Sequence, residues 1–359
     1  MSSPTLRSLA KQLGFSRTTI SDSLRNSPRV SPDIAEKVRA GAAAAGYKQN
    51  PLASALMSDL RRSRAHLFRG SIGAITLDEA ERPPHATAFF DELINGARAR
   101  ADALGYNVDK FLIGKTQLSW RRLEGILRSR RIEGLMLLPA WADPDYSKLD
   151  WSRYAGVYCD YLIEHPALNS VCSDHYRSMM TALQTLHTRG YQRLGVVLHR
   201  PHDARLQHRW EAAAIAFQQH AAGVHYVPPL VRDSLSSEEF KAWFRKYSPD
   251  VVLAHHDHVM DWMKESGAQI PTTHGFCCLN VLMKSRPCAG LDLQPRLLGE
   301  HAIEGVIAQL HRNEHGVPSK ASLTTTAAVW VEGPTVRCPP PRTAKEDRAE
   351  TRQAAALQN

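Results

Sequence analysis

A short polar segment near the amino terminus has residue types suited to contact a polar partner. It is LGFSRTTISDSLRN, residues 13–26, and its expected helix has one i, i+4 apolar pair, Ile20 and Leu24. A helix meant for burial would present a wide apolar face. The rest of this helix is instead short, polar and rich in hydrogen-bonding groups, on Arg17, Thr18, Ser21 and Asp22.

The positive charge of the chain is concentrated around this segment. Residues 1–70 contain 12 Lys and Arg against 4 Asp and Glu, whereas the rest of the chain has 33 against 32. The formal net charge of +9 therefore comes almost entirely from the first fifth of the sequence. This asymmetry is typical of a nucleic-acid-binding module joined to a neutral domain. A solvated basic face is the simpler alternative.

Composition and length favour a multidomain globular protein. The chain has 359 residues, 43% hydrophobic and 23% charged, which is long enough for two or three domains. No apolar run approaches the ~20 residues of a membrane span, and MSSPTLRSLA does not follow the plan of a signal peptide. We therefore expect a cytoplasmic, nucleoid-associated protein without a membrane partner. The six cysteines form no C-x-x-C pair, so we expect free thiols.

Capping signals divide residues 1–49 into three short helices. Thr5 is positioned to cap a helix ending at Leu13, and Gly14 ends that helix. Ser16 is positioned to cap the polar helix, and the intervening GFS is the short glycine-containing turn of a helix-turn-helix. A third helix is predicted to begin with Ser31 as N-cap and Pro32 in the first position, and to end at Gly46.

From Gly70 onward, short apolar runs alternate with amphipathic helical segments. This alternation indicates parallel β-α-β units, and about 265 residues of it predict two α/β lobes. The segment 338–359 is Pro-led and then charged, which predicts a disordered tail. The predicted strands are GSIGAITL, NVDKFLI, IEGLMLLP, YAGVYCD, RLGVVLH, DVVLAHH and THGFCCLN. The predicted helices are FFDELINGARARADALGY, LSWRRLEGILRSRR, RSMMTALQTLHTRGY, RLQHRWEAAAIAFQQHA and VMDWMKESG.

These features together resemble the lactose/galactose-repressor (LacI/GalR) family. The specific match is TLRSLAKQLGFSRTTISDSLRNSPRVSPDIAEKVRAGAAAAGYKQNPLASALM, and a looser resemblance extends to about residue 336. The resemblance implies a fold with an amino-terminal three-helix DNA-binding domain and a hinge helix. These would be joined to a two-lobed parallel α/β core like a periplasmic binding protein. The implied ranges are 1–49 for the DNA-binding domain, 50–69 for the hinge and linker, and 70–337 for the core, with lobe 1 at about 70–168 plus 296–323 and lobe 2 at about 169–295 plus 324–337.

The resemblance implies that the second helix enters the major groove of DNA. Arg17 and Thr18 stand at the family's base-reading positions, and an arginine can donate two hydrogen bonds to a guanine. Ser16 and Ser21 are expected to reach phosphates, and Thr5 to cap its helix and also touch phosphate. Asp22 departs from the Arg of many relatives, and either influences base choice or is solvated or locally paired.

The hinge supplies a second expected DNA contact. Leu56 matches the leucine that the family inserts into the minor groove, and Asn50 and Ala53 lead into it. An apolar side chain inserted at a flexible step bends the duplex. Packing of Leu56 on the core is the alternative. Gln49 replaces the family's usual proline, which loosens the turn before the hinge helix.

In the core, the resemblance implies a small molecule between the lobes, at the carboxyl ends of the strands. Asp160 and Arg209 match positions that hold ligand hydroxyls or carboxylates, and Asp257 is a candidate lining residue. Cys277 stands where the family has a sugar-binding Asp, and a thiol is a poor hydrogen-bond partner. The pocket is therefore expected to take a more apolar or anionic ligand, or to be degenerate. Aromatic side chains could stack on a ring or belong to the core, namely Phe89, Phe90, Trp120, Trp141 and Trp210, of which Phe90 is the candidate effector contact.

Other chemistry receives little support. The histidines of HHDH, residues 255–258, lack helical ligand spacing and nearby cysteine partners, so we expect no metal and no cofactor. We find no nucleophile elbow, phosphate loop or paired-carboxylate motif, so we expect no enzyme.

The expected function is that of a sequence-specific regulator of transcription. The protein, most simply a repressor, would bind a near-palindromic DNA operator as a homodimer, and a sugar-like or related metabolite would modulate its affinity. A ligand-independent repressor with a degenerate cleft is the alternative. The candidate DNA-contacting residues are Thr5, Ser16, Arg17, Thr18, Ser21, Asp22, Asn50, Ala53 and Leu56. The candidate effector-contacting residues are Phe90, Asp160, Arg209, Asp257 and Cys277.

Overall fold

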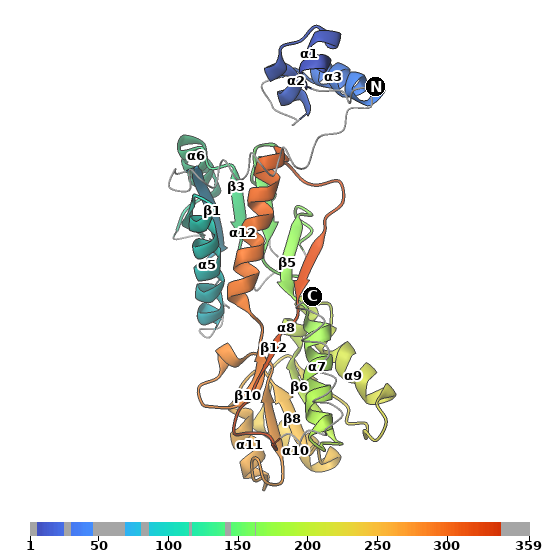
Figure 1. The fold of residues 1–359 in the computed structure, drawn as a ribbon. Helices are drawn as coiled ribbons and strands as arrows, with labels where there is room; N and C mark the ends of the chain where they lie inside the picture. Colours follow the sequence, from blue (N-terminus) through green and yellow to red (C-terminus); the bar gives the residue numbers. More distant parts are fainter. Residues whose placement is uncertain are drawn as a thin grey trace. The chain divides into compact units, whose positions relative to one another are not determined.

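The computed structural model contains a helical amino-terminal segment and two α/β units (Figure 1). It describes residues 6–24, 30–45, 69–79, 86–114, 117–140, 145–161 and 163–338. No helix among these residues has the length and apolar character needed to cross a lipid bilayer. The expected hinge helix and the expected tail beyond Cys338 lie outside the described residues.

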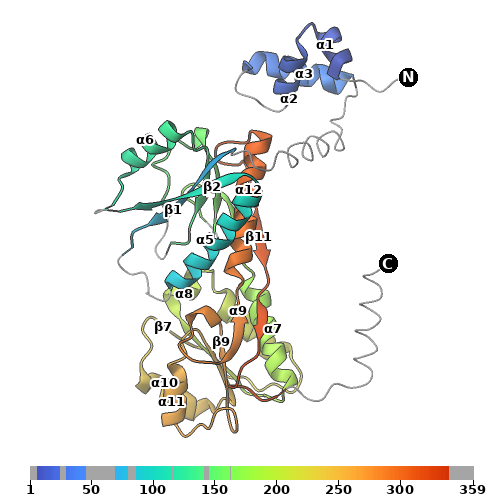
Figure 2. The same ribbon diagram turned by 60° about the vertical axis from the view of Figure 1, so that its left-hand side comes forward.

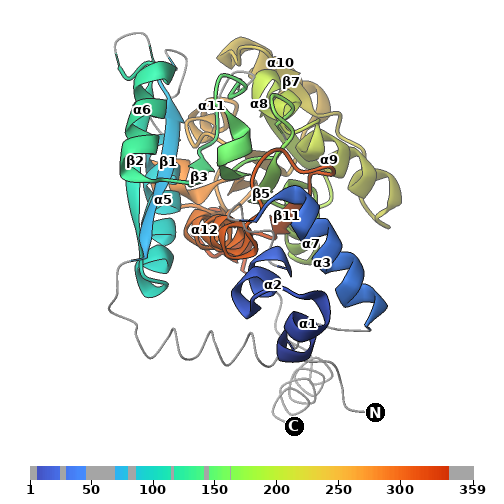
Figure 3. The same cartoon turned by 90° about the horizontal axis from the view of Figure 1, so that it is seen from above.

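Three helices form the amino-terminal segment: α1 (Leu6–Leu13), α2 (Arg17–Leu24) and α3 (Pro32–Ala44) (Figure 3). Their shared core is small and consists of Leu9, Ile20, Val38 and Ala42. Gly14 ends α1 with a φ of 73°, a conformation that glycine adopts without strain. Because α1 and α3 approach closely, a Cβ added to Gly41 would lie 2.6 Å from a methyl of Leu13.

The first α/β unit is built on a six-stranded sheet with the order β11-β5-β4-β3-β1-β2. The pairs β1–β2, β1–β3, β3–β4 and β4–β5 are parallel, as the strand–helix alternation predicts (Figure 2). The strands are β1 (Gly70–Leu77), β2 (Tyr106–Ile113), β3 (Gly134–Leu137), β4 (Ala155–Tyr158), β5 (Asn169–Ser173) and β11 (Leu323–Thr326). The helices are α5 (Ala86–Ala103), α6 (Trp120–Arg130), α12 (Pro295–Arg312) and the 3-10 turn η1 (Trp151–Arg153).

Alternating side chains of this sheet build two separate cores. Ala74 and Met136 face α5 and α12, whereas their neighbours Ile75 and Leu137 face α6. Burial on both faces explains why these strands are continuously apolar in the sequence. Gly96 of α5 and Gly299 of α12 allow the two helices to touch, since a Cβ on either would lie 1.9 Å from a backbone oxygen of the other helix.

The second α/β unit repeats the plan with the strand order β12-β10-β9-β8-β6-β7. The pairs β6–β7, β6–β8, β8–β9 and β9–β10 are parallel, and β10–β12 is antiparallel. The strands are β6 (Leu194–His199), β7 (Leu230–Arg232), β8 (Val251–Ala254), β9 (Gly275–Cys278), β10 (Ala289–Asp292) and β12 (Val329–Val331). The helices are α7 (His175–Thr188), α8 (Arg200–Arg205), α9 (Arg209–His220), α10 (Ser237–Tyr247), α11 (Val259–Glu265) and the 3-10 turn η2 (Val281–Met283).

The chain crosses between the two α/β units three times. The first unit includes the chain up to Cys172 and Pro295–Thr325, and the second includes Ser173–Gln294 and the chain from Thr326 onward. Each unit is therefore completed by a segment distant in sequence. The expected class, a helix-turn-helix joined to a two-lobed parallel α/β core, is confirmed.

Candidate functional site

The polar helix α2 is held in place by very few side chains. Ile20 is fully buried against Leu9 of α1 and Val38 of α3. Ser16 caps the helix, because its Oγ accepts a hydrogen bond from Thr19 N at 3.0 Å and lies 2.8 Å from Thr19 Oγ1. Ser23 is also buried, and its hydroxyl donates to the Thr19 carbonyl at 2.8 Å. This anchoring uses only one side of α2.

The predicted DNA contacts fall partly within the described structure. Ser16 is exposed at the start of α2, and Asp22 is half-buried on the same helix. Arg17, Thr18 and Ser21 contribute backbone to α2, but their side chains lie outside the described structure. The remaining predicted contacts lie entirely outside the described residues: Thr5, Asn50, Ala53 and Leu56. All of these DNA contacts therefore remain predictions.

In the first unit, Asp160 lies just beyond the carboxyl end of β4. Its side chain is 7% exposed, and Oδ1 accepts a hydrogen bond from Tyr161 N at 2.8 Å. Burial, together with the Asp160 charge, raises the pKa of the neighbouring Cys159 thiol. A buried carboxylate at a strand end can hold ligand hydroxyls. Phe90 of α5, by contrast, packs within the apolar core beside Leu93 and Leu298.

In the second unit, Arg209 is the first residue of α9. The preceding Gln207 and His208 have positive φ angles of 52° and 57°, which mark a tight turn between α8 and α9. The buried Asp203 accepts hydrogen bonds from Trp210 N at 3.1 Å and Glu211 N at 3.3 Å, so it caps α9. Burial lowers the pKa of Arg209, which indicates a partly desolvated guanidinium.

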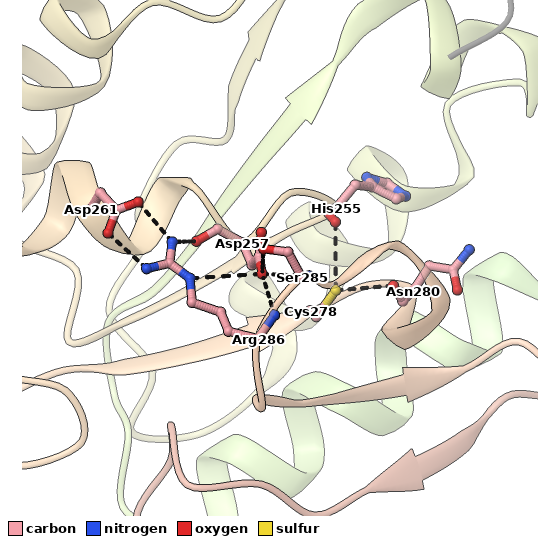
Figure 4. A network of polar contacts seen from close by, with 7 residues as sticks. All are labelled: His255, Asp257, Asp261, Cys278, Asn280, Ser285 and Arg286. Carbon is pink, nitrogen blue, oxygen red and sulfur yellow. Dashed lines mark hydrogen bonds and ion pairs between the residues drawn. The ribbon is translucent and has the colours of Figure 1, made fainter. Parts of the chain in front are cut away.

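Asp257 organises a loop within this unit (Figure 4). Its Oδ2 accepts hydrogen bonds from Ser285 N at 2.7 Å, Ser285 Oγ at 2.8 Å and Arg286 N at 3.0 Å. Arg286 also donates to the Asp257 carbonyl and to both carboxylate oxygens of Asp261. Burial by itself raises the pKa of Asp257, but the hydrogen bonds from Ser285 and Arg286 outweigh it and hold the pKa below its usual range. This geometry supports a structural role, and a ligand contact by Asp257 stays a prediction.

Cys277 lies in the interior of β9 and is completely buried. Burial raises its pKa, so its thiol is neutral. The adjacent Cys278 turns into the opposite core, where its Sγ lies 3.0 Å from the Asn280 carbonyl oxygen and 3.5 Å from the His255 carbonyl oxygen (Figure 4). All six cysteines are free thiols, as expected. Whether Cys277 contacts an effector stays a prediction.

Four aromatic side chains that the sequence does not bring together converge in this unit. The ring of Trp210 lies edge-on to His175 at 5.1 Å and to His255 at 5.6 Å, measured between ring centroids. His255 in turn lies 4.5 Å from His202. We call His175, His202, Trp210 and His255 the imidazole–indole cluster. Its members come from the start of α7, from α8, from the start of α9 and from the loop after β8.

Three members of the cluster are buried and His202 is half-buried, and the charges that act on its histidines are positive. Burial, with a contribution from Arg205, lowers the pKa of His175 to about 3. Burial also lowers the pKa of His202 well below its usual value, and the nearby charges that add to the effect are those of histidines and Arg205. Both imidazoles are therefore neutral near pH 7. Of these four residues, the sequence indicates Trp210 as a candidate for stacking and His255 as part of HHDH, but it gives no indication for His175 or His202.

The three histidines of the HHDH segment do not converge on one point. His255 faces the cluster, whereas His256 and His258 stack on each other at 5.5 Å. Within the described residues, the group with metal-ligand spacing is instead Asp203, His208 and Glu211. Two of these already serve α9, since Asp203 caps its first turn and Glu211 lies in that turn.

The known proteins to which this chain is similar in sequence are regulators of transcription. The chain is 24% identical over 280 residues to the HTH-type transcriptional regulator GalS of Salmonella typhimurium, covering 74% of this chain and 77% of that one. It is 28% identical over 200 residues to the HTH-type transcriptional regulator GntR of Pseudomonas aeruginosa, covering 54% and 53% respectively. No protein-family model matches the chain. Both relatives are named as regulators of transcription and neither as an enzyme, in agreement with the expectation from the sequence.

Solved structures agree on the fold over nearly the whole chain. A complex of the transcriptional regulator CelR with cellobiose superposes with a TM-score of 0.55 at 18% identity, covering 92% of this chain and 99% of that one. A lac repressor dimer bound to operator and an anti-inducer gives a TM-score of 0.53 at 16% identity, covering 94% and 100%. The helix-turn-helix, the two parallel sheets and these relatives agree with the sequence resemblance. The chain is therefore similar in sequence to regulators of transcription, and it shares the fold of the lac repressor, as the resemblance to the lactose/galactose-repressor (LacI/GalR) family implies.

Proposed function

We propose that this regulator binds a near-palindromic operator as a homodimer, and that a small molecule held by the core modulates its affinity for DNA. The proposal of DNA binding rests on how α2 is packed and on which residues it contains. Ile20 and Ser23 anchor one side of the helix, and the sequence gives most of its other positions short polar residues. A helix of this kind reads base edges from the major groove. The two copies would place their α2 helices in successive grooves.

The effector half of the proposal rests on Asp160 and Arg209. Asp160 lies just beyond the carboxyl end of β4, and Arg209 begins α9, which follows β6 and the short helix α8. Open α/β sheets bind ligands beyond the carboxyl ends of their strands. A buried carboxylate accepts hydrogen bonds from ligand hydroxyls, and a guanidinium donates two parallel bonds to an oxyanion or a diol. Ligand binding would change the dimer contacts and the ordering of the hinge over DNA. Such a coupling typically amounts to ~1–3 kcal/mol between the two sites.

A ligand-independent repressor is the second candidate, and Cys277 favours it. The thiol is neutral and buried in β9, at the position where relatives would supply a hydroxyl-binding carboxylate. The carboxylate of Asp257 is also engaged by Ser285 and Arg286. A core of this kind could serve dimerisation alone.

The DNA half is tested with the full chain and an operator selected from a random duplex library. Arg17→Ala should lower affinity for the selected operator and relax preference at one base position, because a base contact is lost. Arg39→Ala, on α3, is the control for loss of positive charge. An equal loss of affinity for every operator variant would contradict a base-reading role for Arg17. Leu56→Ala should reduce DNA bending while the dimer stays intact.

The effector half is tested by thermal shift of the full chain against neutral sugars, uronic acids, phosphosugars and nucleobases. A ligand at 100 times its Kd should stabilise the fold by ~2.7 kcal/mol. Arg209→Ala should abolish that shift. Arg232→Ala is the matched control, because Arg232 is an exposed arginine of the same unit paired with Glu239. If the panel gives no shift while the operator is still bound, the ligand-independent repressor gains support.

A further inference from the structure

The imidazole–indole cluster contains buried polar atoms without a protein partner. Trp210 is fully buried, and its Nε1 has no hydrogen-bond partner among the described residues. His175 is 7% exposed, and its Nδ1 likewise has none among them. A buried donor without a partner costs roughly 1–3 kcal/mol, so such groups rarely persist without a function. Two of them, on rings 5.1 Å apart, point to a polar molecule that completes the cluster.

The charges around the cluster determine which kind of molecule fits. Arg205 on α8 acts on both His175 and His202, and His199 at the end of β6 acts on His202. Arg209 directly precedes Trp210 on α9 and is itself half-buried. Two carboxylates of these elements are already used as helix caps: Asp203 accepts two backbone hydrogen bonds at α9, and Asp174, next to His175, accepts one from Arg177 N at α7. Donors and potential cations therefore dominate the cluster, which suits an oxyanion and not a cation.

We propose that the imidazole–indole cluster binds the oxyanion group of the effector, so that the effector is an anionic metabolite and binds together with a proton. This inference rests on the proposed effector-modulated function and specifies its ligand class. A carboxylate or phosphate oxygen would accept hydrogen bonds from Trp210 Nε1 and from a His175 ring nitrogen. The proton moves from solvent to that imidazole, because the nearby negative charge stabilises the imidazolium.

The experiment compares matched anionic and neutral probes on the full chain, by thermal shift and calorimetric titration. The anionic probes are glucuronate, glucose 6-phosphate, benzoate and inorganic phosphate, and the neutral ones are glucose and benzyl alcohol. We expect at least one anion to raise the Tm and its neutral counterpart to leave it unchanged. With one proton taken up, the Kd should fall ~tenfold for each unit of pH lowered near neutrality. Titration in buffers of different ionisation enthalpy measures the proton directly.

Two variants assign the effect to the cluster. His175→Gln keeps a hydrogen-bonding side chain but cannot become charged, so it should abolish both proton uptake and the pH dependence. Trp210→Phe keeps a ring in the core and removes the indole donor, so it should weaken anion binding. The control is His187→Gln at the other end of α7, where His187 Nδ1 already lies 3.1 Å from the Tyr191 carbonyl oxygen. The Tm of each ligand-free variant shows that it folds.

The outcomes separate this inference from the proposed function. Equal binding of neutral and anionic partners, or binding that His175→Gln leaves unchanged, overturns the anionic site. A neutral sugar whose effect is lost in Arg209→Ala also overturns it, yet sustains the effector-modulated regulator. If none of the four anions raises the Tm, the anionic site is overturned, and operator binding then decides the DNA half alone.

Discussion

Two buried polar regions of the second unit differ in how their hydrogen-bonding atoms are used. Around Asp257, one carboxylate oxygen accepts three hydrogen bonds, and Arg286 connects it to Asp261. In the imidazole–indole cluster, Trp210 Nε1 and His175 Nδ1 have no partner among the described residues. Both regions contain chemically capable residues close to the carboxyl ends of strands. Their residue types alone would make them equally good candidates for a binding site.

Whether a buried polar atom already has a hydrogen-bond partner in the chain therefore distinguishes a structural residue from a ligand-binding one better than its residue type does. A carboxylate whose acceptor sites are filled by the chain stabilises the loop that fills them. Buried groups left without a partner destabilise the free protein until something binds. The Asp257 region should therefore control stability, and the cluster should control ligand response. Four substitutions and pH measurements test that division.

The largest expected effect is that of Asp257→Ala. It removes the acceptor of three hydrogen bonds from Ser285 and Arg286, and hydrogen bonds to charged groups contribute ~1.5–3 kcal/mol. We expect the free energy of unfolding to fall by about 3 kcal/mol, measured by urea denaturation. Because the folded pKa of Asp257 is lowered, its contribution is present above the unfolded pKa of ~3.9 and is lost as pH falls through the folded pKa. A stable variant that loses ligand binding would reverse the assignment.

The second effect is the acid sensitivity contributed by His175. Its pKa is about 3 in the folded chain, below the ordinary value of 6.5, so the unfolded chain binds the proton more readily. Its stabilising contribution is complete above pH ~6.5 and falls by up to ~1.4 kcal/mol for each pH unit below it. His175→Gln should remove this part of the slope between pH 6 and 4.5, as followed by urea denaturation. An unchanged slope would mean that His175 is readily protonated in the folded state.

Much of the fold follows from local sequence signals. GSIGAITL coincides with β1, and Ser16 and Ser31 are N-caps as predicted, although Ser31 makes no side-chain cap hydrogen bond. These features depend on neighbouring residues and on apolar periodicity. The strand β5 and the helices α8 and α10 were not among the predicted elements, and α8 has only six residues.

The candidate site was less predictable, for a physical reason. Its members are separated by up to 80 positions, since His175 begins α7 and His255 follows β8. Only the parallel sheet brings them together, and periodicity carries no information about which strand ends meet. Asp257 was recognised as an acidic residue after a strand, but its partner Ser285 lies 28 residues away. The available signal was the occurrence of histidines at strand and helix ends; in HHDH these favour a polar lining of the cleft over a metal site.

A third, smaller effect tests Asp203, which caps α9 beside the imidazole–indole cluster. Asp203→Ala removes the acceptor for Trp210 N and Glu211 N, and loss of an N-cap costs ~1–2 kcal/mol. Burial raises the pKa of Asp203, so its pH signature is opposite to that of Asp257. Its stabilising contribution is greatest below the unfolded pKa and declines as pH rises through the folded pKa. Because α9 carries Arg209 and Trp210, we also expect weaker effector binding, measured by titration. A loss of stability without any change in binding would separate the cap from the site.

The smallest effect is that of Ser285→Ala, which tests the difference between the Asp257 region and the cluster by removing a single hydroxyl. The variant keeps the Ser285 N–H bond to Asp257 and removes only the Oγ–H bond of 2.8 Å. Ser285 is exposed, so water can reach the vacated acceptor, and the cost should be about 1 kcal/mol by urea denaturation. Binding of an anionic probe should be unchanged, whereas His175→Gln should show the reverse pattern of near-native stability at pH 7.5 and lost binding. If both variants lose binding together, the loop and the cluster form one site, and the division between architecture and function fails.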